Sequence, residues 1–150
     1  MKRFVLGDIH GEYEYLLDVL KKSGFDYEND LLIQIGDIVD RGSEPFKCMD
    51  ELLKIKNLIL IKGNHDASFI NYVNTGKDYL GHHGANGTAV TIYKWKELPV
   101  LDKMKYGEEI FNKMKDYHIT EDNIILYMED LIERRNLKSM KVMNFIGIGN

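Results

Sequence analysis

The sequence predicts an α/β fold, in which a βαβαβ series builds a parallel sheet with flanking helices. Three short apolar runs, Arg3–Leu6, Leu31–Ile35 and residues 58–61, each end near a glycine. Segments with helical periodicity separate them. Strands that alternate with helices of ordinary length favour a parallel sheet whose crossovers are right-handed.

The first two helices have clear local signals. In residues 12–22 leucines recur at helical spacing, and Gly24 follows as a stop. The second helix is expected to begin around Pro45, because proline suits an early helical position. We expect that helix to run to about Lys56.

Beyond the third strand the pattern is less regular. We expect a short helix over residues 67–73, a glycine-rich loop over residues 76–87 and a helix over residues 88–96, after which Pro99 breaks the chain.

The segment after Pro99 is expected to be mostly helical. Residues 108–117 and 121–136 are polar and amphipathic, which favours helices, and residues 142–148 favour one more strand. No linker divides the chain, so we expect a single domain over residues 1–150.

Composition excludes several classes of protein. The chain has 150 residues, of which 44% are hydrophobic and 29% are charged, a balance ordinary for a folded domain. Its 20 Lys and Arg against 24 Asp and Glu give a net charge of −4, which argues against nucleic acid binding by bulk electrostatics. No apolar run approaches the roughly 18 residues that a membrane span needs.

Cysteine usage indicates a reducing compartment. Cys48 is the only cysteine, so an internal disulfide and a cysteine-based zinc site are excluded. We expect Cys48 to be a buried structural thiol. Asp8 ends the first apolar run too early for a signal peptide, and the sequence therefore predicts a cytoplasmic protein.

Polar residues follow each of the three strands. The stretches read Gly7-Asp8-Ile9-His10-Gly11, Gly36-Asp37-Ile38-Val39-Asp40-Arg41-Gly42 and Gly63-Asn64-His65-Asp66. Neighbouring parallel strands end at the same edge of the sheet, so these side chains are expected to converge there. Turn formation explains single Asp or Asn residues, but not such residues on three successive strand ends.

This set of donors suits a divalent metal centre. Carboxylate, imidazole and amide oxygen ligands suit Mn²⁺, Fe²⁺ and Zn²⁺. Asp8 and His10 can reach one ion, Asp37 can bridge two ions, and Asn64 offers a neutral oxygen. Two ions about 3.5–4 Å apart can polarise a phosphoryl group and generate hydroxide between them.

The other side chains of these loops fit roles in phosphoester hydrolysis. His65 would be a general acid for the leaving oxygen, and Asp40 would hold its ring in the right tautomer. Arg41 would bind phosphate oxygens through its planar fork, although Asp40 and Arg41 could instead form a surface ion pair. Asp66 could equally be a cap of the next helix.

Together these stretches resemble the metallophosphoesterase family, also called calcineurin-like phosphoesterases. The forms GDIHG, GDIVDRG and GNHD look closest to its Ser/Thr protein phosphatase branch, which includes bacterial and phage phosphatases and the symmetric diadenosine tetraphosphate hydrolases. The resemblance covers about residues 2–99, and residues 100–150 would be a divergent or truncated tail. It implies the N-terminal half of an α/β/β/α sandwich.

The resemblance also implies an activity and its residues. The activity would be hydrolysis of phosphate monoesters by a Ser/Thr phosphatase that uses two divalent ions, Mn²⁺ in the first place and Fe or Zn as alternatives. The implied metal ligands are Asp8, His10, Asp37 and Asn64, with Asp37 shared between the ions. The implied acid, its partner and the phosphate-binding arginine are His65, Asp40 and Arg41.

The chain departs from the family pattern after Pro99. Family members carry two further metal-binding histidines and a second phosphate-binding arginine, whereas the only histidine here beyond Pro99 is His118, which is expected at a helix end. The second ion then has only two protein ligands. His82 and His83 in the glycine-rich loop are further candidates, although paired loop histidines are more often solvated.

Three alternatives stay open on this departure. The chain could be a shortened, catalytically impaired domain that binds a phosphorylated partner, or an enzyme that hydrolyses diadenosine polyphosphates. A homodimer or a partner chain could also supply the missing ligands, because a truncated sheet exposes a strand edge that invites pairing.

Overall fold

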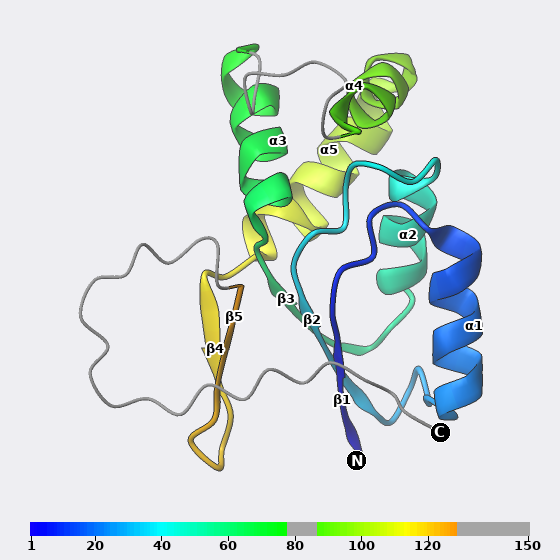
Figure 1. Ribbon diagram of the computed structural model, residues 1–150, viewed down its shortest axis with the longest axis vertical. Coiled ribbons are helices and arrows are strands. Elements are labelled where there is room, and N and C mark those ends of the chain that lie inside the picture. The colour runs from blue at the N-terminus through cyan, green and yellow to red at the C-terminus, as the bar shows by residue number, and fades with distance from the viewer. Residues whose placement is uncertain (78–86, 129–150) are drawn as a thin grey trace.

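The computed structural model describes residues 1–77 and 87–128, and Figure 1 shows their arrangement. Three parallel strands form the main sheet in the order β1-β2-β3 (β1 Arg3–Leu6, β2 Leu31–Ile35, β3 Asn57–Ile61). Phe4 lies beside Leu32, and Leu32 beside Leu58. The parallel sheet and all three of its strands are confirmed.

Two helices lie on the same face of this sheet (Figure 1). Helix α1 (Tyr13–Ser23) ends at Gly24, whose φ of 66° is the left-handed conformation that favours glycine. Helix α2 (Pro45–Leu52) begins at the expected proline but ends before Lys56, because the chain must turn at Leu53 to enter β3.

The core fills the space between the sheet and these helices. Leu16 and Leu20 of α1 and Met49 and Leu52 of α2 are buried there. Cys48 is also fully buried in this core, as expected, and burial raises the pKa of its thiol to about 12.

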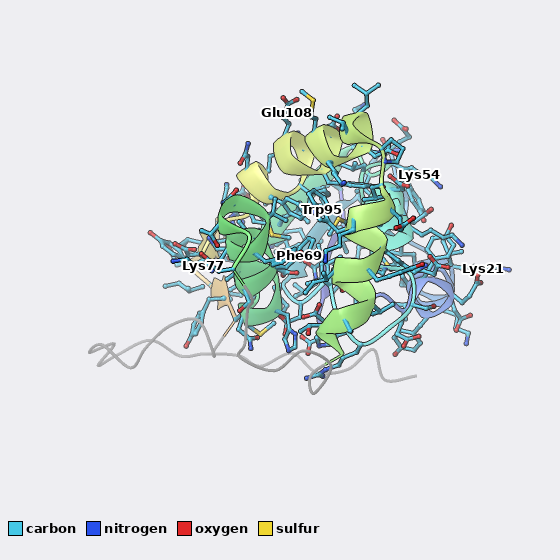
Figure 2. All side chains as sticks on the ribbon, turned by 90° about the horizontal axis from the view of Figure 1, so that it is seen from above. Lys21, Lys54, Phe69, Lys77, Trp95 and Glu108 are labelled. Carbon is cyan, nitrogen blue, oxygen red and sulfur yellow. The ribbon has the colours of Figure 1, made fainter. Side chains whose placement is uncertain are left out.

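Three further helices pack around an aromatic cluster. These are α3 (Asn64–Thr75), α4 (Thr88–Glu97) and α5 (Val100–Glu109). Phe69 of α3 and Trp95 of α4 meet edge to face with ring centroids 5.5 Å apart, and Figure 2 shows them side by side. Phe46 lies 5.9 Å from Trp95, so the cluster joins these helices to α2.

The expected helix over residues 108–117 is wrong. Helix α5 instead begins directly after Pro99 and is followed by the short 3₁₀ helix η1 (Phe111–Lys113). Proline lacks an N–H, which is no cost at the start of a helix, so Pro99 opens this helix as well as ending the previous one. After η1 the chain is extended, because Lys115 pairs with Ile61 at the end of β3.

The prediction of a helix over residues 121–136 is wrong for residues 121–128, because an antiparallel hairpin occupies this part of the chain. Its strands are β4 (Tyr117–Ile119) and β5 (Ile125–Tyr127). Asn123 turns the chain with a φ of 62°, which asparagine tolerates better than most residues. His118 therefore lies in a strand, opposite Leu126, and not at a helix end.

Some expectations fall outside the described residues. They concern His82, His83 and the strand over residues 142–148. Among the residues that the structure does describe, no helix is long and apolar enough to cross a membrane.

Candidate metal centre

The loops that follow β1, β2 and β3 meet at one edge of the sheet, as the topology predicts. The first two loops are joined through their backbones. The N–H of His10 donates to the carbonyl of Asp37 at 2.8 Å, and the N–H of Gly42 donates to the carbonyl of His10 at 2.7 Å. The residues between the glycines are thus held in place before any ligand binds.

The backbone is strained at the predicted site residues. His10, Asp37, Asp40 and Arg41 have φ angles of 46°, 56°, 72° and 68°, in the left-handed region that side chains usually avoid. Among the described non-glycine residues only Asn123 shares this property. Such strain gathers at functional sites, because the surrounding structure must maintain it at a cost of order 1–3 kcal/mol for each residue.

His10 has the environment of a metal ligand. Its Nδ1 lies 2.8 Å from the carbonyl oxygen of Val39, an acceptor that fixes the proton on Nδ1 and leaves a lone pair on Nε2. Nε2 is buried and has no hydrogen-bond partner among residues 1–77 and 87–128. It faces the carboxylates of Asp8 at 3.7 Å and Asp37 at 3.8 Å.

A divalent cation fits among these three side chains. A buried acceptor without a donor is costly, and two carboxylates near it repel each other unless a cation lies between them. Burial raises the pKa of Asp37 above its ordinary value, although the hydrogen bond from the N–H of His65 lowers it in part. Asp8 is half exposed, so the group opens to solvent on one side.

His65 and Asp40 form a buried pair. Nδ1 of His65 lies 2.7 Å from Oδ2 of Asp40, and both side chains are almost completely buried. The rings of His10 and His65 are 5.0 Å apart. His10, Asp37 and His65 each place a donor atom within 4.8 Å of the others, so His65 borders the candidate metal position.

Asp66 contributes more than the helix cap that the sequence suggested. It does cap α3, since its Oδ2 accepts the N–H of Gly63 at 3.0 Å. The same carboxylate accepts the N–H groups of Asp37 at 2.6 Å and of Ile38 at 2.9 Å. One buried side chain therefore fixes the loop after β2 to the loop after β3.

Helix α4 and its N-cap residue bond the loop after β2, a support that the sequence did not indicate. The hydroxyl of Thr91 accepts the N–H of Asp40 at 2.9 Å, and the carbonyl of Gly87 accepts the N–H of Arg41 at 2.9 Å. These contacts join residues about fifty positions apart in the sequence, and no local pattern reveals them.

The other predicted residues lie at the same edge. Arg41 is exposed on the turn after Asp40, and Asn64 is the first residue of α3. His118 lies on β4 and is not one of the three grouped donors. Met128 follows β5, and its methyl carbon lies 3.1 Å from the position that a Cβ atom on Gly36 would take. The chain that leaves the hairpin therefore returns to this edge of the sheet.

Comparison with known proteins decides the family. The sequence model of the calcineurin-like phosphoesterases matches residues 1–144. The chain belongs to this family. The match extends well beyond Pro99, where the motifs recognised in the sequence end.

Two curated relatives of the chain differ in their substrates. Serine/threonine-protein phosphatase 1 of Salmonella typhimurium is 38% identical over 63 residues, which are 42% of this chain and 29% of the phosphatase. The asymmetrical bis(5'-nucleosyl)-tetraphosphatase PrpE of Halalkalibacterium halodurans is 25% identical over 134 residues, which are 81% of this chain and 54% of that enzyme. The chain thus spans about half the length of these relatives or less.

Solved structures agree on the fold. A candidate diadenosine tetraphosphatase aligns with a TM-score of 0.61 and 20% identity, over 83% of this chain and 48% of its own. A metallophosphoesterase from Sphaerobacter thermophilus aligns with a TM-score of 0.55 and 18% identity, over 81% of this chain and 44% of its own.

Proposed function

We propose that the protein is a divalent-metal-dependent phosphoesterase that hydrolyses phosphate monoesters, with phosphoserine and phosphothreonine in proteins as the substrate class. The observation that carries the proposal is the buried Nε2 of His10, which has no hydrogen-bond partner in the described part of the chain and faces the carboxylates of Asp8 and Asp37. The family membership and the phosphatase relative support the reaction class.

The proposed ligands form two unequal sites. Asp8, His10 and Asp37 would hold a first ion, and Asp37 and Asn64 a second one that the described residues complete only in part. We propose Mn²⁺, because this mixed set of oxygen and imidazole donors suits it, with Fe and Zn as the alternatives. When bound, such ions polarise the phosphoryl group and lower the pKa of water beside them.

His65 would deliver a proton to the leaving oxygen. Its Nδ1–H donates to Asp40 at 2.7 Å, an arrangement that orients the ring and leaves Nε2 as the atom that exchanges the proton. Arg41, exposed on the same turn, would bind the phosphate oxygens with its planar fork.

Mn²⁺-dependent hydrolysis of p-nitrophenyl phosphate by the purified protein tests this assignment. His65→Asn is expected to lower kcat by about 10²–10⁴-fold, the usual contribution of an acid catalyst, while Mn²⁺ affinity measured by calorimetry stays unchanged. Asp37→Asn is expected to reduce both quantities, because it removes a ligand. His118→Asn is the matched control, and it should leave both unchanged. Equal turnover by the His65→Asn variant and the wild type would refute the role of His65.

A second candidate substrate is a diadenosine polyphosphate, which the broader alignment with the tetraphosphatase PrpE favours. The ratio of kcat/KM for diadenosine tetraphosphate to that for a phosphoserine peptide separates the two. A folded protein that binds Mn²⁺ and a phosphopeptide but turns over neither substrate would be the impaired binding domain.

Location and assembly belong to the same proposal. The single, buried cysteine fits a cytoplasmic enzyme, because reducing compartments keep such thiols free. A homodimer that completes the second metal position is the assembly to test. Light scattering that finds a monomer with full Mn²⁺-dependent turnover would exclude it.

A further inference from the structure

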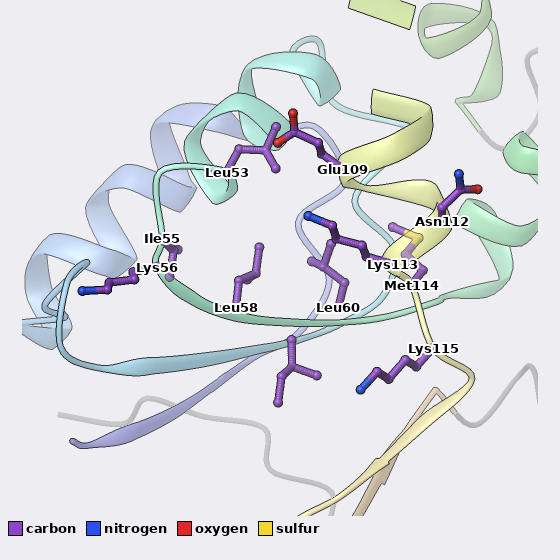
Figure 3. A pocket seen from close by; sticks show the side chains of 11 residues that line it. Leu53, Ile55, Lys56, Leu58, Leu60, Glu109, Asn112, Lys113, Met114 and Lys115 are labelled. Atoms are coloured by element: carbon purple, nitrogen blue, oxygen red, sulfur yellow. The ribbon is translucent and has the colours of Figure 1, made fainter. Parts of the chain in front are cut away.

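A cavity of about 500 Å³ lies along β3. Its inner wall is apolar and includes Leu53, Leu58, Leu60 and Met114. Figure 3 shows these side chains between β3, the end of α2 and η1. A site of this size accommodates several side chains of a bound segment.

Along this cavity the described residues leave the edge of β3 open. Lys115 pairs with the strand only at its end, where its N–H donates to the carbonyl of Leu60 at 2.9 Å and its carbonyl accepts the N–H of Lys62 at 2.8 Å. Alternate residues of a strand turn their backbone groups to the same edge, so the N–H and carbonyl of Leu58 face the same edge as the carbonyl of Leu60. No described residue forms a hydrogen bond to them there. An unpaired edge of this kind is a template for another strand.

The rim of the cavity is basic, although the chain as a whole has a net charge of −4. Three exposed lysines surround it, namely Lys56, Lys113 and Lys115, and Glu109 is the only carboxylate among the described residues that line it. Lys113 and Lys115 form no ion pair with the described residues, and Lys56 lies 3.8 Å from the exposed Glu28. The rim therefore favours an acidic ligand.

We propose that this groove binds an extended acidic peptide of a partner protein, which adds to β3 as a further strand. Its backbone would bond to Leu58, its apolar side chains would alternate into the cavity, and its carboxylates would meet the lysines. This is strand addition, in which main-chain bonds give affinity and alternate side chains give specificity. A second copy of the chain is disfavoured, because symmetric pairing of two β3 edges would bring six like-charged lysines together.

The probe is a fluorescein-labelled peptide, capped at both ends, that alternates valine with glutamate over seven residues. We expect saturable binding by fluorescence anisotropy and selective shifts of the Leu58 and Leu60 amides in nitrogen–proton NMR spectra. The same peptide with lysine in place of glutamate should bind at least tenfold more weakly, because it meets a rim of like charge. Equal affinity for both peptides, or unmoved Leu58 and Leu60 amides at saturation, would overturn the proposal.

Charge reversal at the rim provides the matched comparison. Lys113→Glu with Lys115→Glu is expected to weaken binding of the glutamate peptide about tenfold. Lys21→Glu with Lys77→Glu changes the net charge equally at exposed positions elsewhere and should leave binding nearly unchanged. If the Leu58 amide is already protected from hydrogen exchange in the free protein, whether monomer or dimer, another segment occupies the edge and the proposal fails. No readout here depends on phosphoesterase activity.

Discussion

Replacing Asp66 by asparagine is expected to loosen two of the three site loops at once. The carboxylate of Asp66 accepts N–H groups from Asp37, Ile38 and Gly63 at 2.6, 2.9 and 3.0 Å. An asparagine keeps one acceptor oxygen and places an amide N–H₂ against at least one of these donors. A hydrogen bond to a charged group contributes about 1.5–3 kcal/mol, and a buried donor left unpaired costs a similar amount.

We therefore expect Asp66→Asn to lower the free energy of unfolding by about 3 kcal/mol at pH 8, measured by urea denaturation with EDTA present. Mn²⁺ affinity should also fall, because the Asp37 loop loses its anchor. Burial raises the pKa of Asp66 to about 6. At pH 5 the folded wild type therefore holds a proton on this carboxyl that the unfolded chain does not, which stabilises the wild type, so its lead over the non-titrating asparagine variant should widen relative to pH 8.

The matched control is Asp18→Asn, which removes an exposed carboxylate from an ion pair with Lys22. Exposed pairs of this kind contribute about 0–1 kcal/mol, so its urea midpoint should hardly move. An Asp66→Asn variant that unfolds at the wild-type urea concentration at pH 8 would refute the reasoning, since the loops would then not depend on this carboxylate.

Three further predictions test other supports of the site and the core. Thr91→Val removes the acceptor of a buried loop N–H and should lower the free energy of unfolding by about 1–3 kcal/mol, measured by thermal unfolding. The buried hydroxyl of Thr88 has no partner among the described residues, so Thr88→Val should be neutral or stabilising in the same measurement. Gly63→Ala would push a methyl group into the Asp37 carboxylate and should abolish Mn²⁺ binding in calorimetry. Cys48, with its raised pKa and full burial, should resist iodoacetamide at pH 8 until the protein is denatured, and labelling of the native protein detected by mass spectrometry would contradict that.

The strands and the convergence of the polar loops that follow them could be predicted because each depends on a local pattern. Two of the three sheet strands have the predicted bounds, Arg3–Leu6 and Leu31–Ile35, since apolar runs that end at glycines leave little freedom. Once the sheet is parallel, its carboxyl ends must bring Asp8, Asp37 and His65 to one edge.

The rest could not be predicted because it depends on contacts between distant segments. The hydrogen bonds from Asp37 to Asp66 and from Asp40 to Thr91 have no signature in local spacing. Residues 121–127 have an amphipathic pattern too short to separate a helix from a hairpin, and the turn at Asn123 decides between them.

The hydrogen bonds that join the site loops limit how such a centre can change in evolution or be transplanted. The loops after β1 and β2 share backbone bonds through His10 and Gly42, and Asp66 ties the second loop to the third. An insertion in the loop after β2 would break bonds to both other loops, and an insertion in either of those would break its bonds to the loop after β2. New substrate preferences are therefore expected to arise by exchange of peripheral segments, and a designer must graft all three strand ends as a single block.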